Sequence, residues 1–188
     1  MISPETVARV RFRPMRLEDV EPVYAIDVLS FSLPWSERAY RYEVTENQNS
    51  RSWVVEALNA QGQARIVGML VAWLVLDEAH IATIAVHSDF RRMGLGRRLL
   101  ALALLDAAER GALQALLEVR RGNLGAQQLY RQFGFEVVGM RPRYYVDNQE
   151  DALLMTLAAI DSTLLRSLAA DRPGEPPSSA SHDPFHPA

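Results

Sequence analysis

The sequence predicts an α/β domain with a mixed sheet and helices on both of its faces. Three observations predict this class: strand-like and helix-like segments alternate, a turn-rich connection separates two long strand-like segments, and a glycine-rich turn joins a strand to a helix. The chain has 188 residues, of which 48% are hydrophobic, and it has no cysteine. Its length is enough for one domain with a core, and the lack of thiols excludes disulfides, thiolate zinc sites and a cysteine nucleophile.

The amino-terminal half is expected to form a strand, two helices and a hairpin. Residues 10–15 are extended, residues 17–29 form a helix with acidic residues in its first turn, and residues 36–46 form a helix that begins at a capping serine. The hydrophobic segments 53–58 and 65–75 flank the turn-rich sequence NAQGQA. We therefore expect them to pair as an antiparallel hairpin.

A strand, a turn, a helix and a second strand follow in the middle of the chain. They cover residues 78–86, 96–110 and 113–119, and Gly111 can end the helix in a left-handed conformation. A crossover of this kind places its two strands parallel, with their carboxyl ends at the same edge of the sheet. A ligand is therefore expected at that edge, beside the turn.

Two further helices and a tail are expected after this unit. Asn123 can cap a helix over residues 124–133, which Gly134 can close. Leucine and isoleucine at helical spacing predict a short helix over residues 158–170 that packs on the domain, or alternatively on a partner. Proline, serine and glycine predict that residues 171–188 are disordered.

Charge and hydropathy narrow the classes of partner. The net charge is -3 and the basic residues cluster near the glycine-rich turn, which argues against direct nucleic-acid binding. No segment approaches the ~20 apolar residues that span a bilayer, and the start lacks a signal core, so we expect a cytoplasmic protein without membrane contact. No metal is expected, because metal-ligand spacing is missing among the four histidines, His80, His87, His182 and His186.

The turn in IAVHSDFRRMGLGRR, residues 84–98, is suited to bind phosphate. Gly94 and Gly96 lack a Cβ, so the N–H groups of residues 92–97 can converge on an anion where the helix begins. Positive charge is expected there from the side chains of Arg91, Arg92, Arg97 and Arg98. Leu99 stands where a dinucleotide-binding fingerprint needs its third glycine or alanine, so that fingerprint is excluded. A nucleotide P-loop is excluded because no G-K-[S/T] occurs, and the remaining pattern is R-x-x-G-x-G. A glycine-containing turn before an ordinary helix is the alternative.

Glu118 is a candidate base. Alternation puts Leu117 and Val119 on one face of the strand and Glu118 on the other, so the carboxylate is rigidly carried. An amine is protonated near neutral pH and needs a base, reached directly or through water, before it can attack. An ion pair with Arg120 or Arg121 is the structural alternative.

Tyr130 is a candidate acid. It lies on the helix expected over residues 124–133, where Ala126 and Phe133 share its face. A core ring with its hydroxyl at the edge is therefore the structural alternative. From that edge a phenol could also protonate a departing thiolate, so both roles are compatible.

Four longer motifs follow one another along the chain: FSLPWSERAY, IAVHSDFRRMGLGRRLL, LEVRRGNLGAQQLYRQFGF and RPRYYVDNQEDALLM. Together they resemble the GNAT family of acetyltransferases, and especially its RimI type, the bacterial ribosomal-protein alanine N-acetyltransferases. The resemblance implies a mixed, mostly antiparallel sheet with a central parallel strand pair. It also implies an acetyltransferase domain over residues 9–160, with a helical extension over residues 161–170 and the tail outside it.

The resemblance implies a role for each site residue. Acetyl-CoA is the donor, and the acceptor amine attacks it in a ternary complex without an acyl-enzyme, with Glu118 as general base and Tyr130 as general acid. Along the acetyl-pantetheine arm the resemblance implies Ile84, Ala85 and Val86, with the Val86 amide polarising the thioester carbonyl. Around the pyrophosphate it implies Arg91, Arg92, Met93, Gly94, Leu95, Gly96 and Arg97. It also implies a contact of Asn123 with the donor. Walls of a groove for a peptide amino terminus are implied at Trp35, Tyr144 and Tyr145.

The acceptor implied by the resemblance is a protein amino terminus, the alanine of a small-subunit ribosomal protein. Other amino termini, lysine side chains and small amines are alternatives, as is a module that senses coenzyme A without catalysis. The proline within RPRYY departs from the family pattern and bears on acceptor choice.

Overall fold

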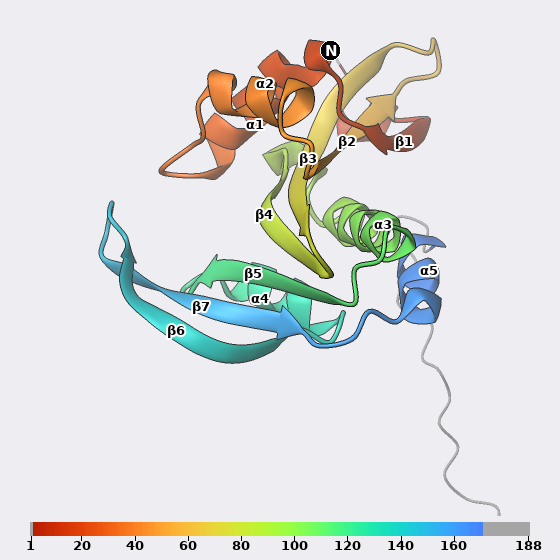
Figure 1. The fold of residues 1–188 in the computed structure, drawn as a ribbon. Coiled ribbons are helices and arrows are strands. Elements are labelled where there is room, and N and C mark those ends of the chain that lie inside the picture. The colour runs from red at the N-terminus through yellow and green to blue at the C-terminus, as the bar shows by residue number, and fades with distance from the viewer. Residues whose placement is uncertain (1, 171–188) are drawn as a thin grey trace, which may run out of the picture.

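A seven-stranded twisted sheet organises residues 2–170, the part of the chain that the computed structural model describes (Figure 1). The strand order is β1-β2-β3-β4-β5-β7-β6, and β4 and β5 are the parallel pair in an otherwise antiparallel sheet. This confirms the predicted mixed, mostly antiparallel sheet. The strands are β1 (Arg9–Pro14), β2 (Ser50–Leu58), β3 (Ala64–Val75), β4 (Glu78–Val86), β5 (Gln114–Arg120), β6 (Glu136–Tyr145) and β7 (Glu150–Leu157).

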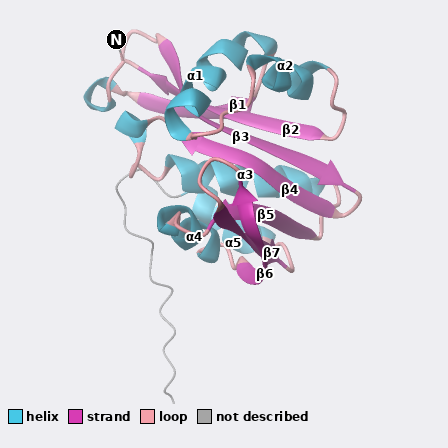
Figure 2. Cartoon of the chain, turned by 90° about the vertical axis from the view of Figure 1, so that its left-hand side faces the viewer, coloured by secondary structure: helices cyan, strands magenta, loops and turns pink. Residues whose placement is uncertain are grey.

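Helices cover both faces of the sheet, as predicted (Figure 2). One face carries α1 (Val20–Ser30) and α2 (Glu37–Thr45), and the other carries α3 (Leu95–Glu109), α4 (Leu124–Arg131) and α5 (Ser162–Ala170). Val54 packs toward α1 and α2, whereas Val55 packs toward α3, because successive strand residues point to opposite faces. None of the helices in the described part has the length and hydropathy of a membrane span.

The predicted helix caps position the helices around the site. Ser36 Oγ accepts from the Ala39 N–H at 3.1 Å, and Asn123 Oδ1 accepts from the Ala126 N–H at 3.1 Å. Gly111 follows α3 with a φ of 101°, in the left-handed region that favours glycine. The local signals for these helices are therefore confirmed.

Two helix starts differ from prediction, each because of an aspartate. Residues 17–19 form a 3-10 helix before α1, held by the Arg16 N–H, which donates to Asp19 Oδ2 at 2.8 Å. The helix expected from residue 158 begins at Ser162, because β7 continues to Leu157 and Asp161 Oδ1 accepts from the Thr163 N–H at 2.8 Å. The tail predicted over residues 171–188, with His182 and His186, lies outside the described residues.

Arg98 is not part of the charged turn, so that expectation was wrong. Its Nε donates to the Ala169 carbonyl at 3.0 Å, and its guanidinium lies 4.6 Å from the centroid of the Phe12 ring. The side chain projects from the face of α3 that packs on α5, where Leu165 and Leu168 are buried. Arg98 thus joins α3 to the carboxyl end of α5, where a cation is favourable.

The parallel strands β4 and β5 pair only over their first half. Register runs from Glu78↔Gln114 to Ile81↔Leu117 and then stops. Ala82 is an extra residue in β4, since Val71 pairs with Thr83 and Ala72 with Ile81, and such a bulge bends a strand. The ribbons of β4 and β5 diverge beyond this point (Figure 1).

Strands β6 and β7 form a hairpin that local pattern did not predict. Most residues of β6, the edge strand of the sheet, are exposed, and burial does not alternate along the strand, so hydrophobic alternation is missing. Pro142 fits an edge strand because it has no N–H to donate. The hairpin adds a second wall beside β5.

Candidate active site

A cleft of about 1370 Å³ opens where β4 and β5 diverge. Its walls are the unpaired ends of both strands, the start of α3, one side of α4 and the loop after α1. The predicted site residues that it brings together are Trp35, Ile84, Ala85, Val86, Arg91, Arg92, Gly94, Leu95, Gly96, Arg97, Glu118, Asn123, Tyr130 and Tyr145. Met93 packs against the core instead, and Tyr144 lies beside Glu118.

The glycine-rich turn forms one end of the cleft. Gly94 is the N-cap of α3 with a φ of 73°, and no side chain in the described residues caps this helix there. The first N–H groups of a 15-residue helix are therefore available to an anion, which the helix dipole also favours. Arg91 Nε donates to the Val86 carbonyl at 3.0 Å and ties the turn to the end of β4.

The two glycines of this turn have different reasons to be glycine. Gly94 needs the left-handed backbone conformation, which costs other residues about 1 kcal/mol. A Cβ on Gly96 would lie 3.7 Å from Val86 Cγ2, which is ordinary contact, so the fold itself does not demand glycine there. Room for a ligand remains the reason predicted for Gly96.

The end of β4 presents to the cleft a backbone edge that β5 does not pair, although Arg91 occupies the Val86 carbonyl. Ile84, Ala85 and Val86 pair with β3 on one side, but β5 no longer pairs with β4 on the other. Backbone N–H and C=O groups need hydrogen-bond partners. An extended ligand that carries amide groups can supply them by lying along this edge as an added strand would.

Glu118 is held by residues from β6. Arg141 Nη1 lies 2.6 Å from Glu118 Oε1, and a hydrogen bond with Glu118, together with partial burial, raises the pKa of Tyr144. The carboxylate side chain is 31% exposed and lines the cleft. It is therefore oriented by two neighbours and still reachable by water or an amine.

The ion-pair partners considered for Glu118 from sequence were wrong. Arg120 pairs with Asp147 and Arg121 pairs with Asp151. The two aspartates lie in the β6–β7 hairpin. Sequence reasoning missed Arg141, because it approaches from an edge strand that shows no periodicity. The sheet order, not the local spacing, decides which arginine meets Glu118.

Tyr130 belongs both to the core and to the cleft. The side chain is 6% exposed, its ring lies 5.9 Å from that of Phe135, and it lines the cleft. Burial raises the pKa of its phenol. The hydroxyl therefore keeps its proton at neutral pH, as a general acid must.

The loop after α1 forms the other end of the cleft. The ring of Trp35 stacks on that of Trp73, with 6.1 Å between the ring centroids. The main-chain N–H of Trp35 donates to Asp27 Oδ2 at 2.6 Å. Asp27 is 1% exposed, lines the cleft and has a pKa raised by burial. Sequence reasoning missed this aspartate, because a single acidic residue within a helix normally marks the solvent-facing side.

Comparisons with known proteins identify a family and several relatives. The profile of the Acetyltransferase (GNAT) family matches residues 20–135. A Bacillus subtilis (strain 168) protein, provisionally assigned as a ribosomal protein bS18-alanine N-acetyltransferase, is 38% identical over 143 residues, which cover 76% of this chain and 91% of the relative. The ribosomal protein bS18-alanine N-acetyltransferase of Escherichia coli (strain K12) is 35% identical over 141 residues, covering 74% and 90%. The crystal structure of the E. coli ribosomal-protein-S18-alanine N-acetyltransferase superposes with a TM-score of 0.72 at 29% identity and covers 81% of this chain and 96% of that chain.

Proposed function

Because this chain belongs to the acetyltransferase (GNAT) family, we propose that it transfers an acetyl group from acetyl-CoA to the amino terminus of a protein. One observation carries the proposal: a single cleft is lined by a helix N-terminus that no side chain of residues 2–170 caps, by the carboxylate that β5 carries and by a buried phenol. The acceptor proposed is the amino-terminal alanine of a small-subunit ribosomal protein, since relatives of 35% and 38% identity are named ribosomal protein bS18-alanine N-acetyltransferases. With this substrate we also propose a cytoplasmic location.

The residues at the donor end fit acetyl-CoA. Main-chain N–H groups from Arg92 to Arg97 would hold its pyrophosphate, and the free edge of Ile84–Val86 would pair with the amides of its pantetheine arm. The Val86 N–H would then face the thioester carbonyl, and Asn123, whose Oδ1 is used by the helix cap, could offer its amide N–H groups. Bound there, the thioester supplies an activated acetyl group.

Glu118 and Tyr130 complete the transfer. Glu118 accepts a proton from the acceptor ammonium, directly or through water, while Arg141 and Tyr144 keep the carboxylate in place. The freed amine nitrogen bonds to the acetyl carbon as the carbon–sulfur bond breaks. Tyr130 gives its proton to the departing sulfur, and the nitrogen loses its second proton to water as the amide forms. Water then returns a proton to the Tyr130 phenolate and takes the proton from Glu118, and no acyl-enzyme forms.

The acceptor end is proposed to hold a chain terminus beside two aromatic side chains. Trp35 from the loop after α1 and Tyr145 from the end of β6 both line the cleft, as does Glu118 on β5. Tyr144 was predicted as a wall residue, and its contacts instead suit it to orient Glu118.

Three acceptors test the proposal: an alanine-starting peptide, the same peptide with a blocked terminus and an added lysine, and a polyamine. Acetylation of the free alanine terminus, read by mass spectrometry, is the expected result. Reaction of the polyamine or the lysine alone would refute the proposed acceptor. Binding of acetyl-CoA without turnover of any amine would favour a coenzyme A sensor.

A further inference from the structure

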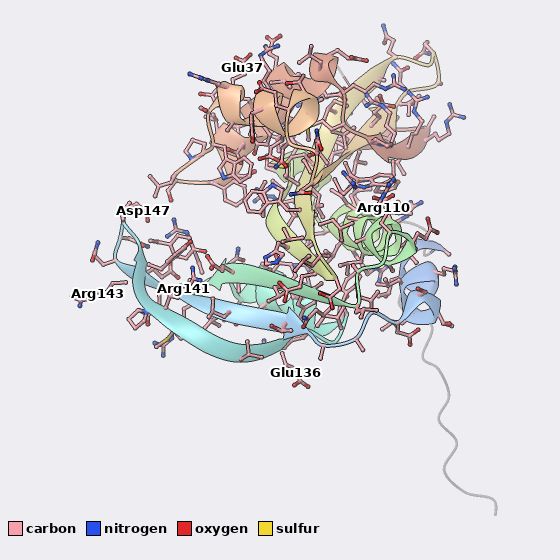
Figure 3. The ribbon with its side chains drawn as sticks, in the orientation of Figure 1. Glu37, Arg110, Glu136, Arg141, Arg143 and Asp147 are labelled. Carbon is pink, nitrogen blue, oxygen red and sulfur yellow. The ribbon has the colours of Figure 1, made fainter. Side chains whose placement is uncertain are left out.

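A hydrogen-bonded bridge crosses the acceptor end of the cleft. Ser32, in the loop after α1, donates to Asp147 in the β6–β7 turn, 115 residues away in the chain. Arg120 Nη2 joins both, at 3.1 Å from Ser32 Oγ and 2.9 Å from Asp147 Oδ2. Asp147 lies at the tip of the hairpin, which projects toward that loop (Figures 1 and 3).

Arg120 also contacts two other residues of the hairpin, Tyr145 and Glu150. Its guanidinium lies 3.8 Å from the centroid of the Tyr145 ring, and its Nη1 lies 3.3 Å from Glu150 Oε2. Glu150 in turn accepts from the Gly122 N–H at 2.6 Å. The arginine thus connects the end of β5, one aromatic wall and the hairpin turn.

We propose that Ser32, Arg120 and Asp147 form a clasp that fixes the spacing between the two walls of the acceptor site. The inference rests on the proposed function. Two exposed loops would otherwise have to be ordered when an acceptor binds, and that cost in conformational entropy weakens binding. A clasp that is already formed removes this cost, so these three are positioning residues for the acceptor.

The charges and exposure of the clasp suit a bridge that persists without ligand. Arg120 and Asp147 are 22% and 19% exposed at the side chain, so both are partly shielded from water. The hydrogen bond from Ser32, followed by those from Arg120, lowers the pKa of Asp147. Asp147 therefore remains charged at neutral pH and keeps its hold on the guanidinium.

The clasp is separable from the chemistry. Glu118 and Arg120 point to the same face of β5, yet Glu118 pairs with Arg141 and takes no part in the bridge. Weakening the clasp should therefore raise the KM for the acceptor while kcat and the KM for acetyl-CoA stay nearly constant. A defect in general structure would instead change all three and lower the melting temperature.

Ser32→Ala is the sharpest variant, because it cuts the bridge at an exposed loop and leaves the Arg120–Asp147 pair intact. We expect an acceptor KM raised a few-fold in Ser32→Ala and about tenfold in Arg120→Ala, with partial recovery in Arg120→Lys. Arg121→Ala is the matched control, since it removes the neighbouring Arg121–Asp151 ion pair without touching the bridge. It should behave as the unmodified enzyme.

Steady-state kinetics with an alanine-starting peptide, and calorimetry of that peptide with coenzyme A present, give the readouts. An acceptor KM and peptide affinity in Ser32→Ala equal to those of Arg121→Ala would overturn the clasp, even if Arg120→Ala fails to fold. Such a result would leave the proposed function standing, because the unmodified enzyme turns the peptide over. No turnover by the unmodified enzyme would overturn the proposed function and this inference with it.

Discussion

Replacing Glu118 with glutamine tests the proposed base, because glutamine keeps the shape of the side chain and removes its ability to take a proton. General bases contribute about 10² to 10⁴ in rate. Glu118 is 31% exposed, so water can partly take over its task, and the structure favours the lower end. We therefore expect kcat/KM for an alanine-starting peptide to fall about 100-fold, or about 2.7 kcal/mol of transition-state stabilisation.

Stability and donor binding should change little in this variant. The lost ion pair joins Glu118 to an Arg141 that is 53% exposed, and such pairs contribute below about 1 kcal/mol. The glycine-rich turn is formed by other elements, so calorimetry should give an acetyl-CoA affinity within about twofold of the original, as uncoupled sites allow. Arg141→Met is the matched control, since it breaks the same ion pair but keeps the carboxylate, and it should cost less than about tenfold in kcat/KM.

Steady-state kinetics of Glu118→Gln and Arg141→Met with the same peptide test whether Glu118 is the general base. Turnover of Glu118→Gln within threefold of the original enzyme, or a larger loss in Arg141→Met than in Glu118→Gln, would refute the assignment of Glu118 as base.

Three further predictions follow from particular contacts. Tyr130→Phe should lower kcat about 10²-fold with unchanged thermal stability, and an unaltered kcat would exclude the phenol as acid. Gly94→Ala should cost about 1 kcal/mol in denaturant unfolding, because its φ is 73°, and should weaken acetyl-CoA binding in calorimetry; intact affinity would argue against the phosphate site. Burial raises the pKa values of Asp19 and Glu56, but it is outweighed by the hydrogen bonds and charge of Arg13 taken together with those of Arg16 at Asp19 and of Arg11 at Glu56, so both pKa values are lowered. Their stabilisation is present above about pH 4 and is lost as pH falls through the lowered values, so acid unfolding should begin at higher pH in Arg13→Met. Superimposable acid-unfolding curves would contradict this.

Interactions between residues that are close in sequence made much of this fold predictable. Ser36 and Asn123 cap helices because their side-chain oxygens accept N–H groups only three residues away, and Gly94 and Gly111 mark turns because few other residues adopt a positive φ. The crossover from β4 to β5 follows from the order of strand, helix and strand. These signals depend on neighbours in the chain, so the donor end of the cleft was predictable.

Tertiary structure alone decided the acceptor end and the partners of the charged residues. Glu118 meets Arg141, Arg98 meets α5 and Ser32 meets Asp147, each across elements that are distant in sequence. A charged side chain can pair with any opposite charge that packing brings within reach, and the order of the strands in the sheet determines which one that is. The sequence by itself therefore determined most of the elements as far as α4 and the glycine-rich turn, and it supplied the candidate catalytic groups. Long-range packing decided the β6–β7 hairpin, how the cleft opens and which side chains meet across it.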